Sequence, residues 1–220
     1  MLIRSLLTQS LIAALLMTIG YYIWYVHINY RFEEISPNKV YKSALIPPSK
    51  IGDFLKKNKI KTVVNLLDPR TQDELNPATQ SEIDIEENAI AEYNLINNES
   101  VKHINIPSKQ VPSEDKIEQF LELLDDPNSY PVLIHCYHGT GRAELYSAIY
   151  RLEYENWTNQ DAREKTRLIL SALGYKSSFA IGQKKGDFLN NYITRKNKSN
   201  KESETNISSN ESLTTTVGIH

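Results

Sequence analysis

The 220-residue sequence contains a single cysteine, Cys136. One cysteine excludes an intramolecular disulfide and any zinc site built from clustered cysteines. An excess of charge of one sign is also absent, because 25 Lys and Arg residues nearly balance 27 Asp and Glu residues. Without a broad basic field, the composition gives no reason to expect nucleic-acid binding. The sequence has no internal repeat, and its length fits one domain of ordinary size with extensions.

Long apolar runs are scarce, and only the run from Leu6 to Val26 lacks charge and is long enough to cross a bilayer as a helix. Four aromatic residues gather at its C-terminal end, where an aromatic belt would lie: Tyr21, Tyr22, Trp24 and Tyr25. A cleaved signal peptide and a buried core helix are the alternatives. The run is long for a signal peptide and no Ala-x-Ala-like site follows it. We therefore expect an uncleaved membrane anchor over residues 1–29.

The orientation of this anchor is not fixed by its flanking charges. Arg4 precedes the apolar run, while Arg31, Lys39 and Lys42 follow it, so the positive-inside rule does not separate the two sides. A short N-terminal anchor often leaves the domain that follows it outside the cytoplasm, and we expect that arrangement here.

The other end of the chain differs in composition. From Lys196 to His220 the sequence consists mainly of Asn, Ser, Thr, Lys and Glu, with almost no large apolar residues. Such a segment buries too little surface to offset chain entropy. We expect residues 196–220 to be a disordered polar tail.

Residues 30–195 alternate between strand-like and helix-like patterns, after an irregular connector over 30–40 that contains Pro37. Apolar and β-branched runs predict strands over four segments: 40–43, 61–67, 101–106 and 130–136. Helical spacing predicts helices over five segments, with caps at Ser49 and Ser113: 48–55, 79–94, 113–121, 143–154 and 160–173. This alternation predicts one α/β domain with a central, mostly parallel sheet flanked by helices. Ligands of such sheets bind beyond the carboxyl ends of the strands.

One segment joins a predicted strand to a predicted helix through a glycine-bearing loop: His135-Cys136-Tyr137-His138-Gly139-Thr140-Gly141-Arg142. Backbone N–H groups in such a loop hold an anion, and the helix dipole favours negative charge there. The same field favours the thiolate form of Cys136 near neutral pH. The planar fork of Arg142 can hold two phosphate oxygens. The alternative is that Cys136 is an inert, buried cysteine at the end of a strand.

This pattern resembles the His-Cys-(five residues)-Arg signature of the cysteine-dependent protein tyrosine phosphatase superfamily, and most closely its small, bacterial-like dual-specificity members. The resemblance extends more weakly from about residue 35 to 195, through the following pieces: Tyr41-Lys42-Ser43-Ala44, 62–66, 104–107, and 150–152 with Trp157. It implies a dual-specificity phosphatase-like fold, which here follows the one transmembrane helix expected from the apolar run. It also implies a two-step phosphoryl transfer, in which Cys136 forms a phosphocysteine.

The resemblance also implies roles for the loop residues. Backbone N–H groups from Tyr137 to Arg142, with the Arg142 fork, would stabilise the phosphoryl oxygens. His135 would position Cys136 and help to keep it a thiolate, or would be a buried, hydrogen-bonded histidine, and both can hold. His138 would add positive charge below a pH of about 6.5, or would point to solvent. No metal or other cofactor is required by this chemistry.

The sequence departs from the family pattern in two places. The family usually has Ser or Thr directly after the arginine, where its hydroxyl assists hydrolysis of the phosphoenzyme, but this chain has Ala143. The family's general acid is an aspartate on the loop that here follows residues 106–107, yet residues 108–112 contain no acid. Three carboxylates are weak candidates, more readily understood as turn or helix-start residues: Asp68, Glu114 and Asp115. We therefore leave the general acid unassigned.

The loop also bears on the substrate. In the family that this pattern resembles, members that prefer polyphosphorylated inositols tend to have lysines or arginines inside the loop. This chain has neither between Cys136 and Arg142. The resemblance therefore favours phosphoprotein substrates, of the phosphotyrosine or dual-specificity kind, over phosphoinositides. The sequence thus predicts a membrane-anchored cysteine phosphatase. There are two alternatives: a catalytically weakened module that binds phosphorylated partners, motivated by Ala143 and the missing acid, and a phosphoinositide phosphatase.

Overall fold

The computed structural model describes residues 2–70, 78–166, 177–200 and 203. The chain divides into two compact units, Met1–Ser147 and Ala148–His220, and each is described by itself. The boundary falls within one helix, α5 (Arg142–Tyr154). The first unit contains the sheet and the whole of the cysteine loop.

The first unit is built on a five-stranded sheet with the order β1-β2-β5-β3-β4. The strands are short: β1 (Glu33–Ser36), β2 (Val40–Ser43), β3 (Thr62–Asn65), β4 (Lys102–Asn105) and β5 (Val132–His135). Only β1 is antiparallel to its neighbour, and the other pairs are parallel. The prediction of a mostly parallel sheet is confirmed, and β5, which leads to the cysteine, lies at its centre.

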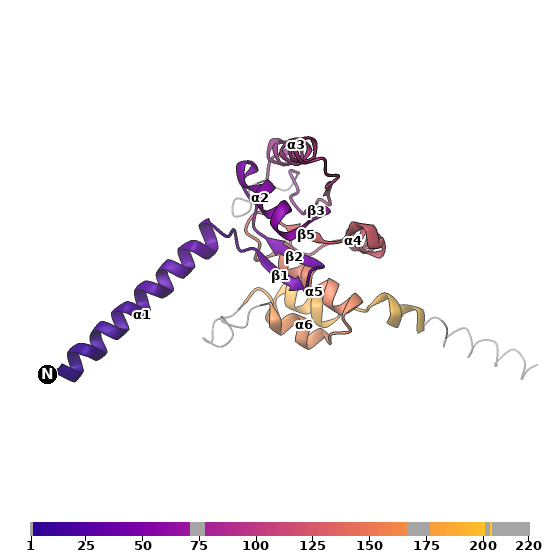
Figure 1. Ribbon diagram of the computed structural model, residues 1–220. Helices are drawn as coiled ribbons and strands as arrows, with labels where there is room; N and C mark the ends of the chain where they lie inside the picture. The colour runs from indigo at the N-terminus through magenta and orange to yellow at the C-terminus, as the bar shows by residue number, and fades with distance from the viewer. Residues whose placement is uncertain (1, 71–77, 167–176, 201–202, 204–220) are drawn as a thin grey trace, which may run out of the picture. The chain divides into compact units, whose positions relative to one another are not determined.

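Helices cover both faces of this sheet (Figure 1). They are α2 (Pro48–Asn58), α3 (Gln80–Asn97), α4 (Glu114–Asp125) and the start of α5. One face packs Val63 and Leu133 against α2 and α3, around a buried cluster that includes Ile51 and Ile90. On the other face, Lys42 of β2 pairs with Glu144 of α5 at 2.9 Å. Strand residues alternate between the faces, so the two helix layers follow from the sequence pattern.

The ends of the elements differ from several expectations. Residues 33–36 were expected to be irregular but form β1, which is stabilised by antiparallel pairing with β2 rather than by its own composition. The N-cap of α2 is Pro47, not Ser49, because Pro48 occupies the first turn. Ser113 is the N-cap residue of α4 but makes no side-chain cap hydrogen bond. Thr79, in contrast, forms a full capping box with Glu82 at the start of α3.

The second unit contains the end of α5, α6 (Asn159–Lys165) and α8 (Lys184–Asn190), of which α8 was not predicted. The Asn159 side chain joins the two helices by donating to the carbonyls of Leu189 and Tyr192. The helix predicted over 160–173 ends earlier, at Lys165, with Thr166 as its C-cap residue. Residues 167–173 lie outside the described residues. Residues 195–200 are helical, and most of the predicted tail lies outside the described residues, so its disorder and the domain boundaries stay predictions.

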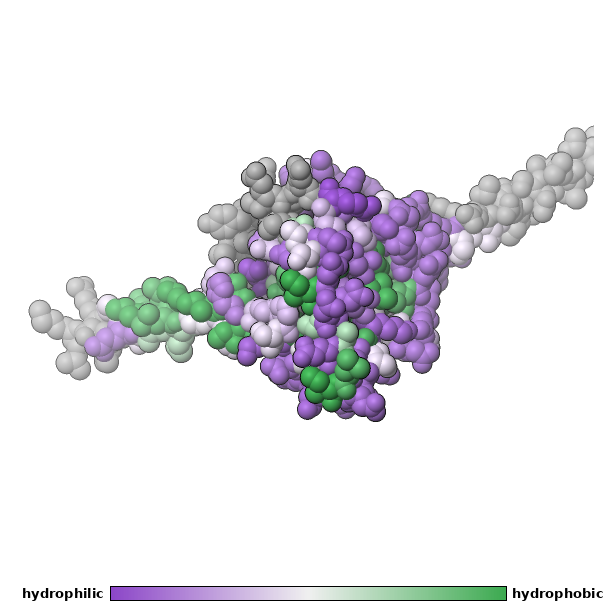
Figure 2. All heavy atoms as spheres, turned by 90° about the horizontal axis from the view of Figure 1, so that it is seen from above, coloured by the Kyte–Doolittle hydropathy of each residue, from purple (hydrophilic) through white to green (hydrophobic). Residues whose placement is uncertain are grey.

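The N-terminal helix α1 (Leu2–His27) includes a 20-residue stretch, Thr8–His27, that is long and apolar enough to cross a membrane. Its apolar side chains are exposed, with Leu11 at 71% and Met17 at 70%. Figure 2 shows their hydrophobic surface along the described part of the helix. This exposure argues against the alternative of a buried core helix.

Candidate active site

The site is built at the carboxyl ends of three neighbouring parallel strands. The sheet register aligns Ser43 of β2, His135 of β5 and Asn65 of β3. All three are buried polar residues. Cys136 follows His135 directly and is 1% exposed. The motif therefore lies where open α/β sheets bind ligands, as the sequence predicted.

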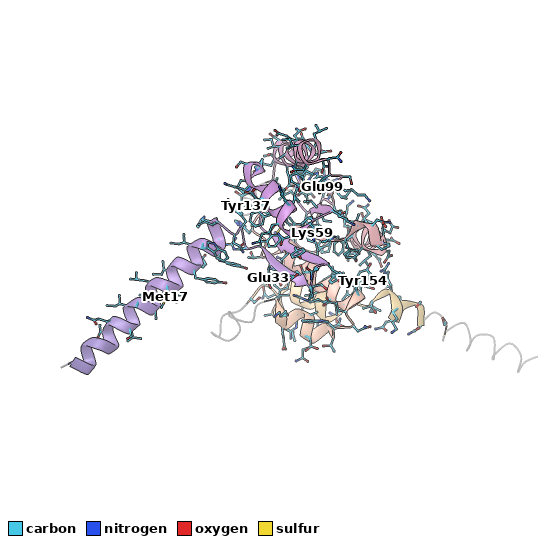
Figure 3. The ribbon with its side chains drawn as sticks, viewed as in Figure 1. Met17, Glu33, Lys59, Glu99, Tyr137 and Tyr154 are labelled. Carbon is cyan, nitrogen blue, oxygen red and sulfur yellow. The ribbon has the colours of Figure 1, made fainter. Side chains whose placement is uncertain are left out.

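At one position, the backbone of the loop after Cys136 has room only for glycine. Gly139 has a φ of +69°, and a β-carbon there would lie 2.5 Å from the backbone nitrogen of Ala44. Such a close approach is accessible only to a residue without a side chain. The loop is also held from outside: the Leu45 N–H donates to the Tyr137 carbonyl at 3.2 Å, and Arg31 Nη1 donates to the His138 carbonyl at 2.9 Å. Figure 3 labels Tyr137 in this loop.

Arg142, the first residue of α5, is turned into the protein and is 4% exposed. Its Nη1 donates to the carbonyls of Leu66, at 2.8 Å, and Ser108, at 3.2 Å. Its Nε is buried and has no hydrogen-bond partner among the described residues. A buried donor left unpaired costs about 1–3 kcal/mol. This side of the guanidinium is therefore suited to an anion, as a phosphate clamp requires.

The remaining loop residues were singled out for binding phosphate through their backbone. Tyr137 and Thr140 are half-buried, Gly141 is partly exposed, and His138 is exposed. The rings of Tyr137 and His138 meet edge to face at 4.8 Å. The exposure of His138 favours the expectation that it points to solvent.

Behind the loop lies a buried ionic cluster that the sequence did not reveal. Glu86 of α3 is 2% exposed, and its Oε2 lies 3.0 Å from Nε2 of both His135 and His103. Burial by itself would raise the pKa of Glu86, but the two histidines outweigh it and lower the pKa to about 2. A signal for Glu86 existed in the sequence, since it shares the buried face of α3 with Ile83 and Ile90.

None of the three acid candidates is placed by the structure as a clear proton donor. Asp68 is buried and accepts hydrogen bonds from Arg70 N and Nε at 3.1 and 3.0 Å. The side chain of Asp115 is 63% exposed, 3.5 Å from Lys116. A hydrogen bond from Ser113 lowers the pKa of Asp115, as suits an exposed helix-start residue. Glu114 is likewise exposed in the first turn of α4.

The segment after β4, where the family places its acid, contains Ser108 instead. Ser108 is buried, its hydroxyl is hydrogen-bonded to the Tyr146 hydroxyl, and its carbonyl accepts from Arg142. Burial raises the pKa of Tyr146 to about 12. Ala143, next to Arg142, is fully buried and has no hydroxyl to offer. Among the described residues no three His, Cys, Asp or Glu side chains are grouped to hold a metal ion.

Comparison with known proteins gives one family and a set of similar folds. The model of the family described as DSP-PTPase phosphatase fused to NAD+ kinase matches residues 49–182, more than half of the chain. No curated protein sequence matches the chain.

Two of the similar solved structures illustrate the likeness, each with a TM-score just above 0.5. The core catalytic domain of the PP-IP phosphatase Siw14 from S. cerevisiae, in complex with citrate, has a TM-score of 0.51 and 16% identity, covering 74% of this chain and 85% of that one. TpbA from P. aeruginosa has a TM-score of 0.52 and 20% identity, covering 75% of this chain and 86% of that one. At these identities the likeness concerns the fold.

Proposed function

Since the chain belongs to the family described as DSP-PTPase phosphatase fused to NAD+ kinase, a family of cysteine-based phosphatases of the dual-specificity type, we propose that it hydrolyses phosphate monoesters on proteins through a phosphocysteine intermediate. One observation carries the proposal. Arg142 is buried and is held by two backbone carbonyls, and its Nε, at the end of the loop that Cys136 begins, is paired with no residue that the structure describes. This is the arrangement that a phosphate dianion needs.

In the first step the Cys136 thiolate attacks phosphorus, an S–P bond forms, and the bond from phosphorus to the leaving oxygen breaks. The leaving oxygen takes a proton, from water where no side chain supplies it. In the second step water attacks the phosphocysteine, which releases phosphate and restores the thiolate. Loop N–H groups and Arg142 stabilise the phosphoryl oxygens in both steps. His135 holds the end of the strand that presents the sulfur.

The proposed substrates are phosphoproteins, with phosphotyrosine included, since the loop has no lysine or arginine between Cys136 and Arg142. Phosphorylated inositols or lipids are the second candidate. The fold is similar to that of Siw14, whose structure is described as a PP-IP phosphatase. Binding without turnover is the third, and it is supported by Ala143 and by the absence of a clearly placed acid among the described residues.

We further propose that α1 anchors the enzyme in a membrane, with the catalytic domain on the non-cytoplasmic side. His27 ends α1, and Arg31, four residues later, donates to the carbonyl of His138 in the cysteine loop. Four residues span at most about 14 Å. A phosphate group bound by this loop would therefore lie close to the bilayer surface.

The proposal is tested by aryl phosphate hydrolysis with the full chain in detergent. We expect Cys136→Ser to abolish turnover, because serine does not supply a thiolate. Arg142→Lys keeps the charge but loses the fork, so we expect it to lower kcat/KM by about 10²-fold. Equal rates for wild type and Cys136→Ser would contradict the proposed enzyme.

The candidate substrates are separated by binding to the inactive Cys136→Ser chain. We expect phosphotyrosine peptides to bind more tightly than inositol phosphates, and Arg142→Ala to abolish both. Preferential binding of inositol phosphates would contradict the protein substrate. If wild type binds phosphopeptides but does not hydrolyse aryl phosphates, the binding module is the correct alternative.

A further inference from the structure

Glu86 is a carboxylate on the apolar face of a helix. It lies on α3 between Ile83 and Ile90, all three are buried, and the helix packs on the sheet. Taking a carboxylate out of water costs several kcal/mol unless partners compensate it. The buried Glu86 carboxylate therefore needs compensating partners. The strands on which α3 packs provide them.

Each of the three parallel strands β3, β4 and β5 directs one polar residue to the same atom. Glu86 Oε2 accepts a hydrogen bond from Asn65 Nδ2 at 2.7 Å. The same oxygen lies 3.0 Å from His103 Nε2 and 3.0 Å from His135 Nε2. The two histidines are the charged or titratable groups that interact with it. Three nitrogen atoms on one oxygen suit an ionised carboxylate, which has more acceptor capacity than a neutral amide oxygen.

One arm of this cluster leads to the nucleophile. His135 is the last residue of β5, and Cys136 follows it. His135 Nε2 lies at ion-pair distance from Glu86 Oε2, 3.0 Å, although the pair lacks hydrogen-bond geometry. The His135 carbonyl accepts from the Leu66 N–H at 3.0 Å. Both contacts fix the point at which the chain leaves the sheet and presents the sulfur.

The other arm leads to the phosphate clamp. Asn65 Oδ1 accepts from the Leu67 N–H at 2.8 Å. Asn105 Nδ2 donates to the carbonyls of Asn65 and Leu67, both at 3.0 Å. These contacts fix the turn after β3, and the carbonyl of Leu66 in that turn accepts from Arg142 Nη1 at 2.8 Å. A continuous set of contacts thus runs from Glu86 through Asn65 to the guanidinium.

We infer that Glu86 is a positioning residue that sets the nucleophile Cys136 and the clamp Arg142 relative to one another, through His135 on one side and Asn65 on the other. Glu86 touches no reacting atom. The inference rests on the proposed phosphatase function, because the distance between sulfur and guanidinium matters only if both act on one phosphate. A displacement of about 1 Å in such a pair can cost about 10²-fold in rate.

The test compares two isosteric changes on neighbouring residues of α3. Glu86→Gln removes the buried charge, and Glu87→Gln makes the same change at an exposed position. The full chain is assayed in detergent with an aryl phosphate, and rates are divided by the amount of Cys136 that iodoacetate titrates. We expect Glu86→Gln to lower kcat/KM by about 10- to 100-fold and to raise the inhibition constant of orthovanadate about tenfold. Glu87→Gln should stay within about twofold of wild type.

Dividing each rate by the amount of reactive Cys136 separates an effect on the geometry of the site from an effect on the stability of the fold. A residue that only stabilises the fold would reduce the amount of active protein but would leave kcat/KM and vanadate inhibition per reactive site unchanged. Glu86→Gln values within twofold of wild type would overturn the inference while leaving the proposed function intact. A wild-type chain without Cys136-dependent hydrolysis would contradict the proposed function instead.

A measurement on the wild-type chain covers the case in which Glu86→Gln does not fold. Long-range ¹H–¹⁵N spectra of histidine-labelled protein report which ring nitrogens carry protons. Because Nε2 of His103 and His135 both face the Glu86 oxygen, we expect both to be protonated at pH 7, with His103→Gln assigning the signals. An unprotonated Nε2 on His135 would remove the contact to Glu86 and overturn the inference.

Discussion

The charge of Glu86 links the stability of the fold to pH. Burial opposes ionisation, but His135 and His103 outweigh burial and lower the pKa of Glu86 to about 2. In the unfolded chain the same carboxyl titrates near 4.3. A carboxyl whose pKa is lower in the folded state contributes stability above its unfolded pKa and loses it as the pH falls toward the folded value. The contribution is thus complete at pH 6 and disappears between about pH 5 and 2.

We predict that the free energy of unfolding of wild type falls by about 2 kcal/mol more than that of Glu86→Gln between pH 6 and pH 3. The difference arises because the variant has no carboxyl at this position to protonate. Urea unfolding at a series of pH values, with Glu87→Gln as control, measures it. Parallel pH curves for wild type and Glu86→Gln would show that Glu86 is not ionised in the fold.

At the scale of single residues, the sequence pointed to the proposed nucleophile and clamp but not to the residues that support them. Cys136 and Arg142 belong to one contiguous motif, so spacing alone brings them together. Glu86 lies about 50 residues from that motif, and only the fold brings it to His135. His103 was missed for the same reason, because its partner lies on a different element. The spacing of Glu86 with Ile83 and Ile90 was a readable signal of a buried carboxylate.

Among the elements, the cysteine loop is the most restricted in backbone. Gly139 combines a φ of +69° with an approach of 2.5 Å to the Ala44 nitrogen for any added β-carbon. Gly182 provides a matched comparison, because its φ is +83° but nothing lies within 4 Å of an added β-carbon. The first position thus combines conformational strain with a collision, and the second has strain alone.

We predict that Gly139→Ala lowers kcat/KM for an aryl phosphate by 10²-fold or more, on the order of a 1 Å displacement of the loop. Gly182→Ala should cost about 1 kcal/mol of stability and leave kcat/KM unchanged. Kinetics and thermal unfolding of both variants measure the two effects. Full activity of Gly139→Ala would show that the close packing of the loop against β2 is not needed for phosphate transfer.

Helices and strands with a strong apolar periodicity were predicted from the sequence. Short elements whose structure depends on pairing or packing with other elements were missed. Four strands and four helices follow from apolar patterns, as does the short helix α6 in part, and the fold class is confirmed. The strand β1 has only four residues and depends on pairing with β2. The helix α8 has seven residues, of which Lys185, Gly186 and Leu189 are buried, so its pattern is not that of an amphipathic helix. Short elements give too few residues for a period to be recognised.

At the scale of the whole molecule, the proposal to test is that α1 anchors the chain in a membrane. We predict that the full chain stays with the membrane fraction after alkaline carbonate extraction, because its 20-residue apolar stretch, Thr8–His27, is long enough to span the bilayer. A chain that lacks residues 2–27 should be released into the soluble fraction. Release of the full chain would contradict anchoring, and loss of the N-terminal segment from the mature protein would establish a signal peptide.

The expected orientation can be read from the single cysteine. In intact cells that express the full chain, a membrane-impermeant thiol reagent should label Cys136 if the catalytic domain is non-cytoplasmic. Cys136→Ser provides the background. Labelling that occurs only after the cells are opened would place the domain in the cytoplasm.

The most direct test of the account is the protection of Cys136 by orthovanadate against alkylation with iodoacetate, since the chain has no other thiol. A sulfur at an anion site made of backbone N–H groups and a guanidinium should be alkylated more slowly when orthovanadate fills that site. Arg142→Ala should lose this protection. Equal alkylation rates of wild type with and without orthovanadate would contradict the anion site on which the proposed function rests.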